Sequence, residues 1–193
     1  MISKLNKIPT ITPEMVEELK MRLGNSILPP DELQTNSVED LLSYGVSVES
    51  LKNISDYWIN NYDFTAFNQH LESLPHFTAS TNQLDQLHFL HYPPRDESIK
   101  STPLLLVHGW PGSFLEFTLD LIPLLQNQDP SLEIIVPSLP GFAFSSPPKS
   151  TNFGVYEIAK TLNYLMVNLL GFGSGYIAQG GGISLTKNLS VTI

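Results

Sequence analysis

The fold is decided by the stretch Leu104-Leu105-Leu106-Val107-His108-Gly109-Trp110-Pro111-Gly112. It joins four consecutive apolar residues to a turn built from histidine, glycine, tryptophan and proline. A short apolar run that ends in turn-forming residues is typical of a buried strand in a parallel sheet. Glycine lets the backbone approach a ligand closely, and a turn after such a strand can point N–H groups into the crevice at the strand ends. We therefore expect residues 104–107 to form a strand and residues 108–112 to border a site.

Apolar runs alternate with helical patterns around this stretch. Residues 87–91, 133–136 and 176–179 read as strands, while residues 113–125 and 152–170 show the apolar spacing of helices. Pro123 must bend or end the first of these helices. Strands that alternate with helices favour a parallel, three-layer α/β sheet with right-handed crossovers. The fold class is therefore α/β.

The chain before residue 100 looks like a mostly helical region that wraps a larger body. Residues 1–11 look extended, and Thr12 is an N-cap for a helix that stops near Gly24. Further helices are expected at residues 36–42, after Ser47, and after Asp63 or Thr65. We expect residues 1–100 to form this N-terminal region, residues 101–182 the first part of the core, and residues 183–193 a divergent tail.

Aromatic residues gather on the expected helices of this region. A ligand-binding box is one interpretation, and packing of a helical pair is the favoured one, because aromatics at helical spacing usually belong to a core. The residues concerned are Tyr57, Trp58, Tyr62, Phe64 and Phe67.

Composition narrows the classes of function. The chain has 193 residues, a net charge of −9, 41% hydrophobic residues and no cysteine. The acidic balance argues against nucleic acid and anionic membranes as partners, and disulfides and thiolate metal sites are excluded. No apolar run is long enough to span a membrane, and residues 1–10 contain no membrane anchor. We expect a soluble, cytoplasmic protein.

Turns that follow the expected strands are where chemistry should lie, because ligands of open α/β sheets bind at the carboxyl ends of strands. These turns are His108–Gly112, Pro137–Phe142 and Gly180–Gly182. The last lacks the full pattern of a phosphate-binding loop, so a nucleophile elbow is favoured over nucleotide binding. His88 and His91 are a weak candidate for a metal pair, because a strand places residues three apart on opposite faces. We expect neither a metal nor a cofactor.

Ordered motifs along nearly the whole chain resemble the microsomal-type epoxide hydrolase family of the α/β-hydrolase superfamily. The motifs are Asp56-Tyr57-Trp58, Tyr62-Asp63-Phe64, Leu74-Pro75-His76-Phe77, the oxyanion loop from His108 to Phe117, Pro137-Ser138-Leu139-Pro140-Gly141-Phe142-Ala143-Phe144-Ser145, and the elbow approach Gln179-Gly180-Gly181.

The resemblance implies that a complete relative adds water to a small apolar epoxide to give a vicinal diol. An Asp on the elbow attacks an epoxide carbon and forms an ester, two Tyr residues hold the epoxide oxygen, and a His oriented by an acid activates water. In this chain the backbone N–H of Trp110 matches an oxyanion donor. The rest of the oxyanion loop comprises His108, Gly109, Pro111 and Gly112, with His108 shaping the turn.

The sequence departs from the family at the elbow. Gly182 occupies the position of the nucleophilic Asp, and the cap, both Tyr residues, the acid and the base have no counterpart. We expect the chain to be truncated at the elbow and inactive. Ser184 is a weak substitute nucleophile, because His108 would then have to act as its base.

Two further interpretations stay open. The chain could be a non-catalytic half-domain that associates through an uncovered sheet edge, for example with a full-length relative. It could instead be a gene-model fragment, in which case the transcript beyond the Gly181 codon would encode Asp-x-Gly-Ser in another frame.

Overall fold

The computed structural model describes residues 1–28 and 45–181. These residues form two compact units. One contains Met1–Lys7 and the chain from Leu74 onward, and the other contains Ile8–Ser73. The expected boundaries at residues 100 and 182 concern family regions and stay predictions.

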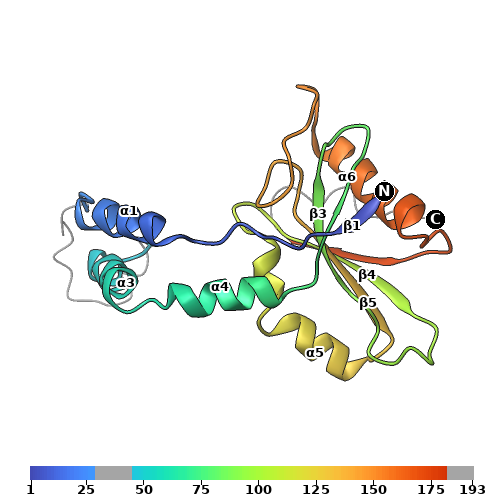
Figure 1. Cartoon of the computed structure of the whole chain (residues 1–193), viewed down its shortest axis with the longest axis horizontal. Coiled ribbons are helices and arrows are strands. Elements are labelled where there is room, and N and C mark those ends of the chain that lie inside the picture. The colour runs from blue at the N-terminus through green and yellow to red at the C-terminus, as the bar shows by residue number, and fades with distance from the viewer. Residues whose placement is uncertain (29–44, 182–193) are drawn as a thin grey trace. The chain divides into compact units, whose positions relative to one another are not determined.

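A six-stranded sheet forms the centre of the larger unit, and β1, β3, β4 and β5 are labelled in Figure 1. The strand order is β1-β2-β3-β5-β4-β6. The neighbours β5, β4 and β6 run parallel, whereas β1, β2 and β3 are antiparallel to their neighbours. The strands are β1 (Ile2–Lys4), β2 (His76–Ala79), β3 (Leu87–Tyr92), β4 (Thr102–Val107), β5 (Leu132–Pro137) and β6 (Ile177–Gly180).

The α/β fold class is confirmed, but the expected parallel pairing holds for only part of the sheet, because β1, β2 and β3 pair antiparallel. A short loop without a helix joins β2 to β3, and such a connection can only join antiparallel strands. Parallel pairing holds where helices intervene, from β4 onward. The strand β2 was not predicted, because its four residues show neither a long apolar run nor a clear alternation of apolar and polar residues.

Helices cover both faces of the sheet. On one face, Leu162 and Leu165 join a buried cluster with Leu87, Phe89 and Val107. The helical segment on this face is α6 (Val155–Tyr164), which continues as a π-helical turn, η2 (Leu165–Leu169). On the opposite face lies the 3-10 turn η1 (Phe114–Phe117), followed by α5 (Leu121–Gln128).

The single helix expected over residues 113–125 is in fact two segments, η1 and α5. Ser113 caps η1 by accepting a hydrogen bond from the Leu115 N–H. Pro123 neither bends nor ends a helix. It lies in the first turn of α5, where the missing N–H would have no intrahelical partner.

The smaller unit contains α1 (Pro13–Gly24), α3 (Val48–Asn60) and α4 (Phe64–Ser73). The expected caps are confirmed. Thr12 accepts from the Met15 N–H, Ser47 from the Ser50 N–H, and Asp63, rather than Thr65, from the Ala66 N–H. The helix expected at residues 36–42 lies outside the described residues.

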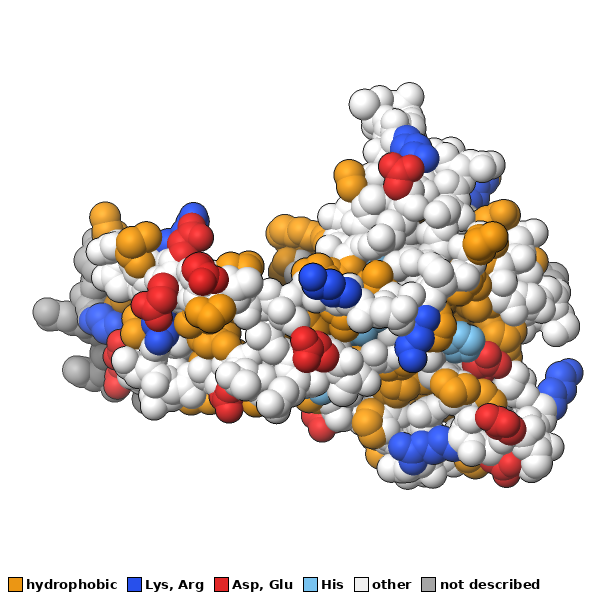
Figure 2. Space-filling view, viewed as in Figure 1, with side chains coloured by type: hydrophobic (Ala, Val, Ile, Leu, Met, Phe, Trp, Pro, Cys, Tyr) orange, Lys and Arg blue, Asp and Glu red, His pale blue; other side chains and the backbone are white. Residues whose placement is uncertain are grey.

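The surface carries charges of both signs. On the face drawn in Figure 2, Lys and Arg side chains stand singly or in small groups among acidic and hydrophobic ones. Among the described residues, no helix is long and apolar enough to cross a membrane.

Candidate functional site

The carboxyl ends of β5, β4 and β6 lie side by side, as the sequence analysis predicts for the chemistry-bearing turns. Val107, the last residue of β4, is paired with Gly180, the last residue of β6. The loops that begin at His108, Ser138 and Gly181 therefore leave the same edge of the sheet. Gln179, Gly180 and Gly181 are part of this edge, whereas Gly182, the expected nucleophile position, lies outside the described residues.

His108 joins the loop after β4 to the loop after β5. Its side chain is buried. The Leu139 N–H donates to His108 Nε2 at 3.1 Å, and His108 Nδ1 lies 3.1 Å from the carbonyl oxygen of Gly109. The ring also meets Phe142 edge-on, with 5.8 Å between centroids. Both ring nitrogens are thus occupied by backbone groups.

Trp110 follows a buried glycine and is itself 64% exposed. The Trp110–Pro111 peptide bond is cis. Within residues 1–28 and 45–181, the Trp110 N–H donates to no protein group. An unpaired backbone donor at the mouth of a parallel sheet is able to bind an oxyanion.

Gly112 allows the turn to close tightly. A Cβ atom placed there would lie 2.7 Å from Glu116 Oε2 and 3.1 Å from the Gly109 carbonyl oxygen. Both distances are shorter than ordinary van der Waals contact. The neighbouring backbone therefore leaves little room for a side chain at this position, and the Glu116 carboxylate would have to move to admit one.

A buried polar network underlies the site, and the sequence analysis did not find it. His88 Nδ1 lies 2.7 Å from Ser138 Oγ, and His88 Nε2 lies 2.8 Å from His76 Nδ1. Ser145 Oγ accepts from the His88 N–H and donates to the Ser138 carbonyl oxygen. Phe114 and Phe144 pack against the two imidazoles. The network fastens the loop after β5 to β3.

Burial sets the charge state of this network. Desolvation, followed by repulsion from His76, lowers the pKa of His88 to about 3. His88 is therefore neutral over the physiological range and acts as a hydrogen-bonding link. The signal in the sequence was a pair of histidines in apolar surroundings, but pairing across β2 and β3 only becomes visible once both strands are placed.

His88 and His91 lie on opposite faces of β3, as a strand requires. His91 Nε2 contacts Glu133 Oε1 at 2.8 Å, on the opposite face from the network of His88. In the described part of the chain no group of three or more metal-ligating side chains is gathered.

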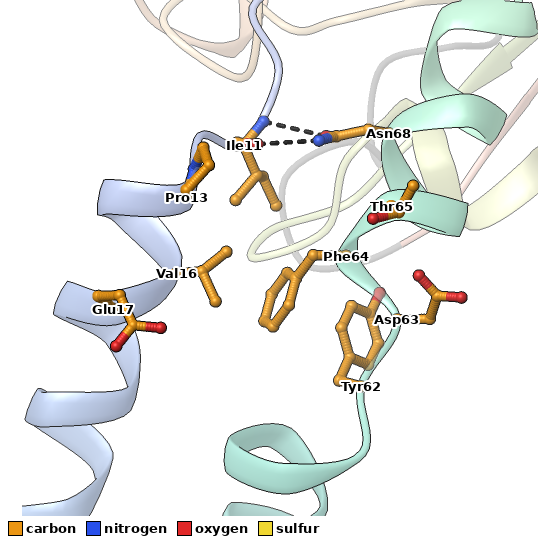
Figure 3. A pocket seen from close by; sticks show the side chains of 9 residues that line it. All are labelled: Ile11, Pro13, Val16, Glu17, Tyr62, Asp63, Phe64, Thr65 and Asn68. Carbon is orange, nitrogen blue, oxygen red and sulfur yellow. Dashed lines mark hydrogen bonds between the residues drawn. The ribbon is translucent and has the colours of Figure 1, made fainter.

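The smaller unit contains a separate cavity of about 420 Å³. Figure 3 shows Tyr62, Phe64 and Val16 turned toward it, with Asn68 hydrogen-bonded to the backbone of Ile11 at its rim. Tyr62 and Phe64 meet edge to face, 4.8 Å apart. Tyr57 and Trp58 are 55% and 42% exposed, and Tyr57 meets Tyr62 edge-on. The expected packing of the helical pair on a larger body stays a prediction.

Comparisons with known proteins all find similarity to epoxide hydrolases. A family model described as the epoxide hydrolase N terminus matches residues 7–117, and an alpha/beta hydrolase fold model matches residues 102–185. Epoxide hydrolase 1 of Oryctolagus cuniculus is 39% identical over 178 residues, which is 87% of this chain and 37% of the relative. Juvenile hormone epoxide hydrolase 1 of Ctenocephalides felis is 32% identical, over 86% of this chain and 38% of the relative.

Solved structures agree with the sequence relatives. The epoxide hydrolase of Aspergillus niger superposes with a TM-score of 0.79 at 33% identity, covering 94% of this chain and 47% of that one. Juvenile hormone epoxide hydrolase from Bombyx mori superposes with a TM-score of 0.76, covering 94% of this chain and 42% of that one. This chain therefore spans less than half the length of these relatives.

Proposed function

Because this chain belongs to the epoxide hydrolase family of the α/β-hydrolase fold, we propose that the edge formed by β5, β4 and β6 is the oxyanion side of an epoxide hydrolysis site. The observation that carries the proposal is the Trp110 N–H. It has no acceptor among the described residues, and it stands on the turn after β4, beside the end of β6.

The chemistry expected at such a site proceeds in two steps. A carboxylate attacks an epoxide carbon, so that a C–O ester bond forms, the ring C–O bond breaks and the ring oxygen takes a proton. Water, losing a proton to a base, then attacks the ester carbonyl carbon, and negative charge develops on the carbonyl oxygen. The acyl C–O bond breaks as this charge collapses, so that the diol leaves with a proton on its oxygen and the carboxylate is restored. A preorganised backbone donor stabilises that charge, which is the role we assign to Trp110.

The residue at position 182 determines whether this chain is able to attack an epoxide carbon. That position holds glycine, which has no side chain to attack a carbon, and residues 183–193 contain no Asp, Glu or His. We propose that the 193-residue chain therefore forms no ester and no diol. Ser184 is not a substitute, because His108, the base that it would need, is buried with both ring nitrogens hydrogen-bonded.

A chimaera tests whether residues 1–181 form a working half of such a site. These residues would replace the matching part of the rabbit relative, with either Asp or Gly at the next position. We expect diol formation from styrene oxide by the Asp chimaera and none by the Gly chimaera. A folded Asp chimaera that makes no diol would contradict the proposal, and circular dichroism with a thermal melt establishes folding.

Association is a second candidate function, favoured by β6. In the described part of the chain β6 pairs only with β4, and Ile177 on it is 54% exposed. An edge strand with unpaired N–H and C=O groups is a template for another chain. We propose that the 193-residue chain self-associates or pairs with a full-length relative at this edge, which light scattering after size exclusion would detect.

A further inference from the structure

We propose that His108 is a positioning residue that fixes the direction of the Trp110 N–H through the intervening Gly109 carbonyl. The functional meaning of this arrangement rests on the proposed function, but the arrangement itself can be tested without any activity. In this proposal each nitrogen of the buried ring has its own role: Nε2 contacts Leu139 and Nδ1 contacts Gly109.

The contact with Leu139 fixes the tautomer of His108. A backbone N–H can only donate, so His108 Nε2 must accept the 3.1 Å hydrogen bond from Leu139 and carries no proton. In a neutral imidazole the proton then resides on Nδ1. The contact of 3.1 Å between Nδ1 and the Gly109 carbonyl oxygen is therefore a hydrogen bond donated by the ring.

The peptide group between Gly109 and Trp110 transmits this constraint. The Gly109–Trp110 peptide bond is trans, since among the described residues only the Trp110–Pro111 bond is cis. In a planar trans peptide the C=O and N–H point in opposite directions. Drawing the Gly109 oxygen toward the buried ring consequently turns the Trp110 N–H away from it, toward the exposed side of the loop.

The segment at Gly112 also approaches this carbonyl oxygen closely. A Cβ on Gly112 would lie only 3.1 Å from the Gly109 oxygen, so the two backbone segments are already in close approach. The donor is thereby preorganised and does not need to turn during a reaction. Preorganised donors stabilise a developing oxyanion more than freely rotating ones.

Leu139, the other end of this arrangement, is itself fixed. Its neighbour Ser138 is fully buried, hydrogen-bonded to His88 through its hydroxyl, and donates its backbone N–H to the His88 carbonyl oxygen. The orientation of Trp110 is thus linked to the β3 strand through backbone groups of two loops. A general-base role for His108 is excluded by the same contacts, since neither nitrogen is available to water.

Nuclear magnetic resonance on the isotopically labelled 193-residue chain tests the tautomer directly. We expect a trans-hydrogen-bond ¹⁵N–¹⁵N coupling between the Leu139 amide and His108 Nε2, with ring ¹⁵N shifts that place the proton on Nδ1. A proton on Nε2, or the lack of that coupling in a folded chain, would overturn the proposal. Neither result depends on whether an epoxide is a substrate.

Matched substitutions separate the two tasks of the ring. His108→Asn keeps a donor near the Nδ1 position, His108→Gln keeps an acceptor near the Nε2 position, and His108→Phe keeps neither. We expect the Trp110 amide signal to shift or broaden in the Phe and Gln variants and to return toward the parent position in the Asn variant. An unchanged Trp110 signal in a folded His108→Phe chain would contradict the proposal.

A control variant accounts for general loss of stability. Gln126 is buried and donates to the carbonyl oxygens of Pro93 and Leu132, at the opposite end of the strands. Gln126→Leu should lower the melting temperature while leaving the Trp110 amide signal in place. If it displaced that signal as much as His108→Phe does, the effect would be structural and the positioning role would be wrong.

Discussion

The hydroxyl oxygen of Ser138 lies 2.7 Å from Nδ1 of His88, within the interior of the larger unit. The contact joins β3 to the loop that follows β5. Since Leu139 in that loop also donates to His108, the loop connects the antiparallel half of the sheet with the turn that carries Trp110. The packing of the antiparallel strands and the geometry of the turn that carries Trp110 are therefore coupled.

The stability of the chain should fall in acid because of His88. Its pKa is lowered from 6.5 to about 3 by burial and then by His76. Between these values the unfolded chain binds a proton that the folded chain does not, so the free energy of unfolding rises with pH. The greatest slope is about 1.4 kcal/mol per pH unit. Urea denaturation at a series of pH values measures it.

His88→Asn should flatten that dependence between about pH 6 and 4, because the amide stays near Ser138 but does not titrate. Thr161→Val is the matched control. It removes a buried hydroxyl that donates to the Glu157 carbonyl and should lower stability without altering the slope. Equal slopes in the parent and His88→Asn chains would show that His88 is not the titrating group.

Gly112→Ala should destabilise the turn after β4. The added Cβ would lie within 3.1 Å of the Gly109 oxygen and 2.7 Å of Glu116 Oε2. The carboxylate can move but the backbone cannot do so freely, and overpacking of this kind costs roughly 1–3 kcal/mol. Gly173→Ala, where the nearest atom is 3.8 Å away, should be close to neutral in the same denaturation experiment. Similar losses in both variants would contradict the tight approach.

Asp63 should contribute to the stability of α4 as its N-cap. Its Oδ1 accepts from the Ala66 N–H at 2.8 Å, so Asp63→Ala should cost about 1 kcal/mol. Asp63→Asn retains the acceptor and should cost much less. Hydrogen exchange along Phe64–Ser73 gives the local readout, and an Ala variant that exchanges as slowly as the parent would refute the assignment.

Ile177→Lys should reduce association at the β6 edge. Charged side chains, lysine above all, block pairing at edge strands, and Ile177 is exposed in the described structure. We expect the parent chain to show a mass above the monomer by light scattering at high concentration, and the variant to approach the monomer. A parent chain that stays monomeric would contradict the association proposal.

Much of the local structure in both units could be predicted from the sequence, because it depends on residues that are close together in the chain. The apolar run of β4, the Thr12 and Ser47 caps and the helical spacing of α6 are each set by neighbouring residues. The strand β2 could not be predicted, because it is four residues long and depends on pairing with β1 and β3.

The sequence was enough to predict where the turn of the candidate site lies, but not which contacts hold it. The turn from His108 to Gly112 was recognisable from its residues, whereas the Leu139 and Gly109 contacts of His108 depend on loops that are distant in sequence. The pairing of His76 with His88 is likewise a tertiary feature. The assignments of the elbow residues, of Gly182 and of a cytoplasmic location stay predictions.

The central claim is that this chain carries the oxyanion-binding side of an epoxide hydrolysis site but has no nucleophile at position 182. Measuring diol formation by the purified 193-residue chain tests this claim most directly. Styrene oxide would be incubated with the chain, with buffer, and with the rabbit relative as positive control, and the diol quantified by chromatography. The account predicts a rate equal to that of buffer at every protein concentration. A saturable rate that rises in proportion to the chain would contradict it.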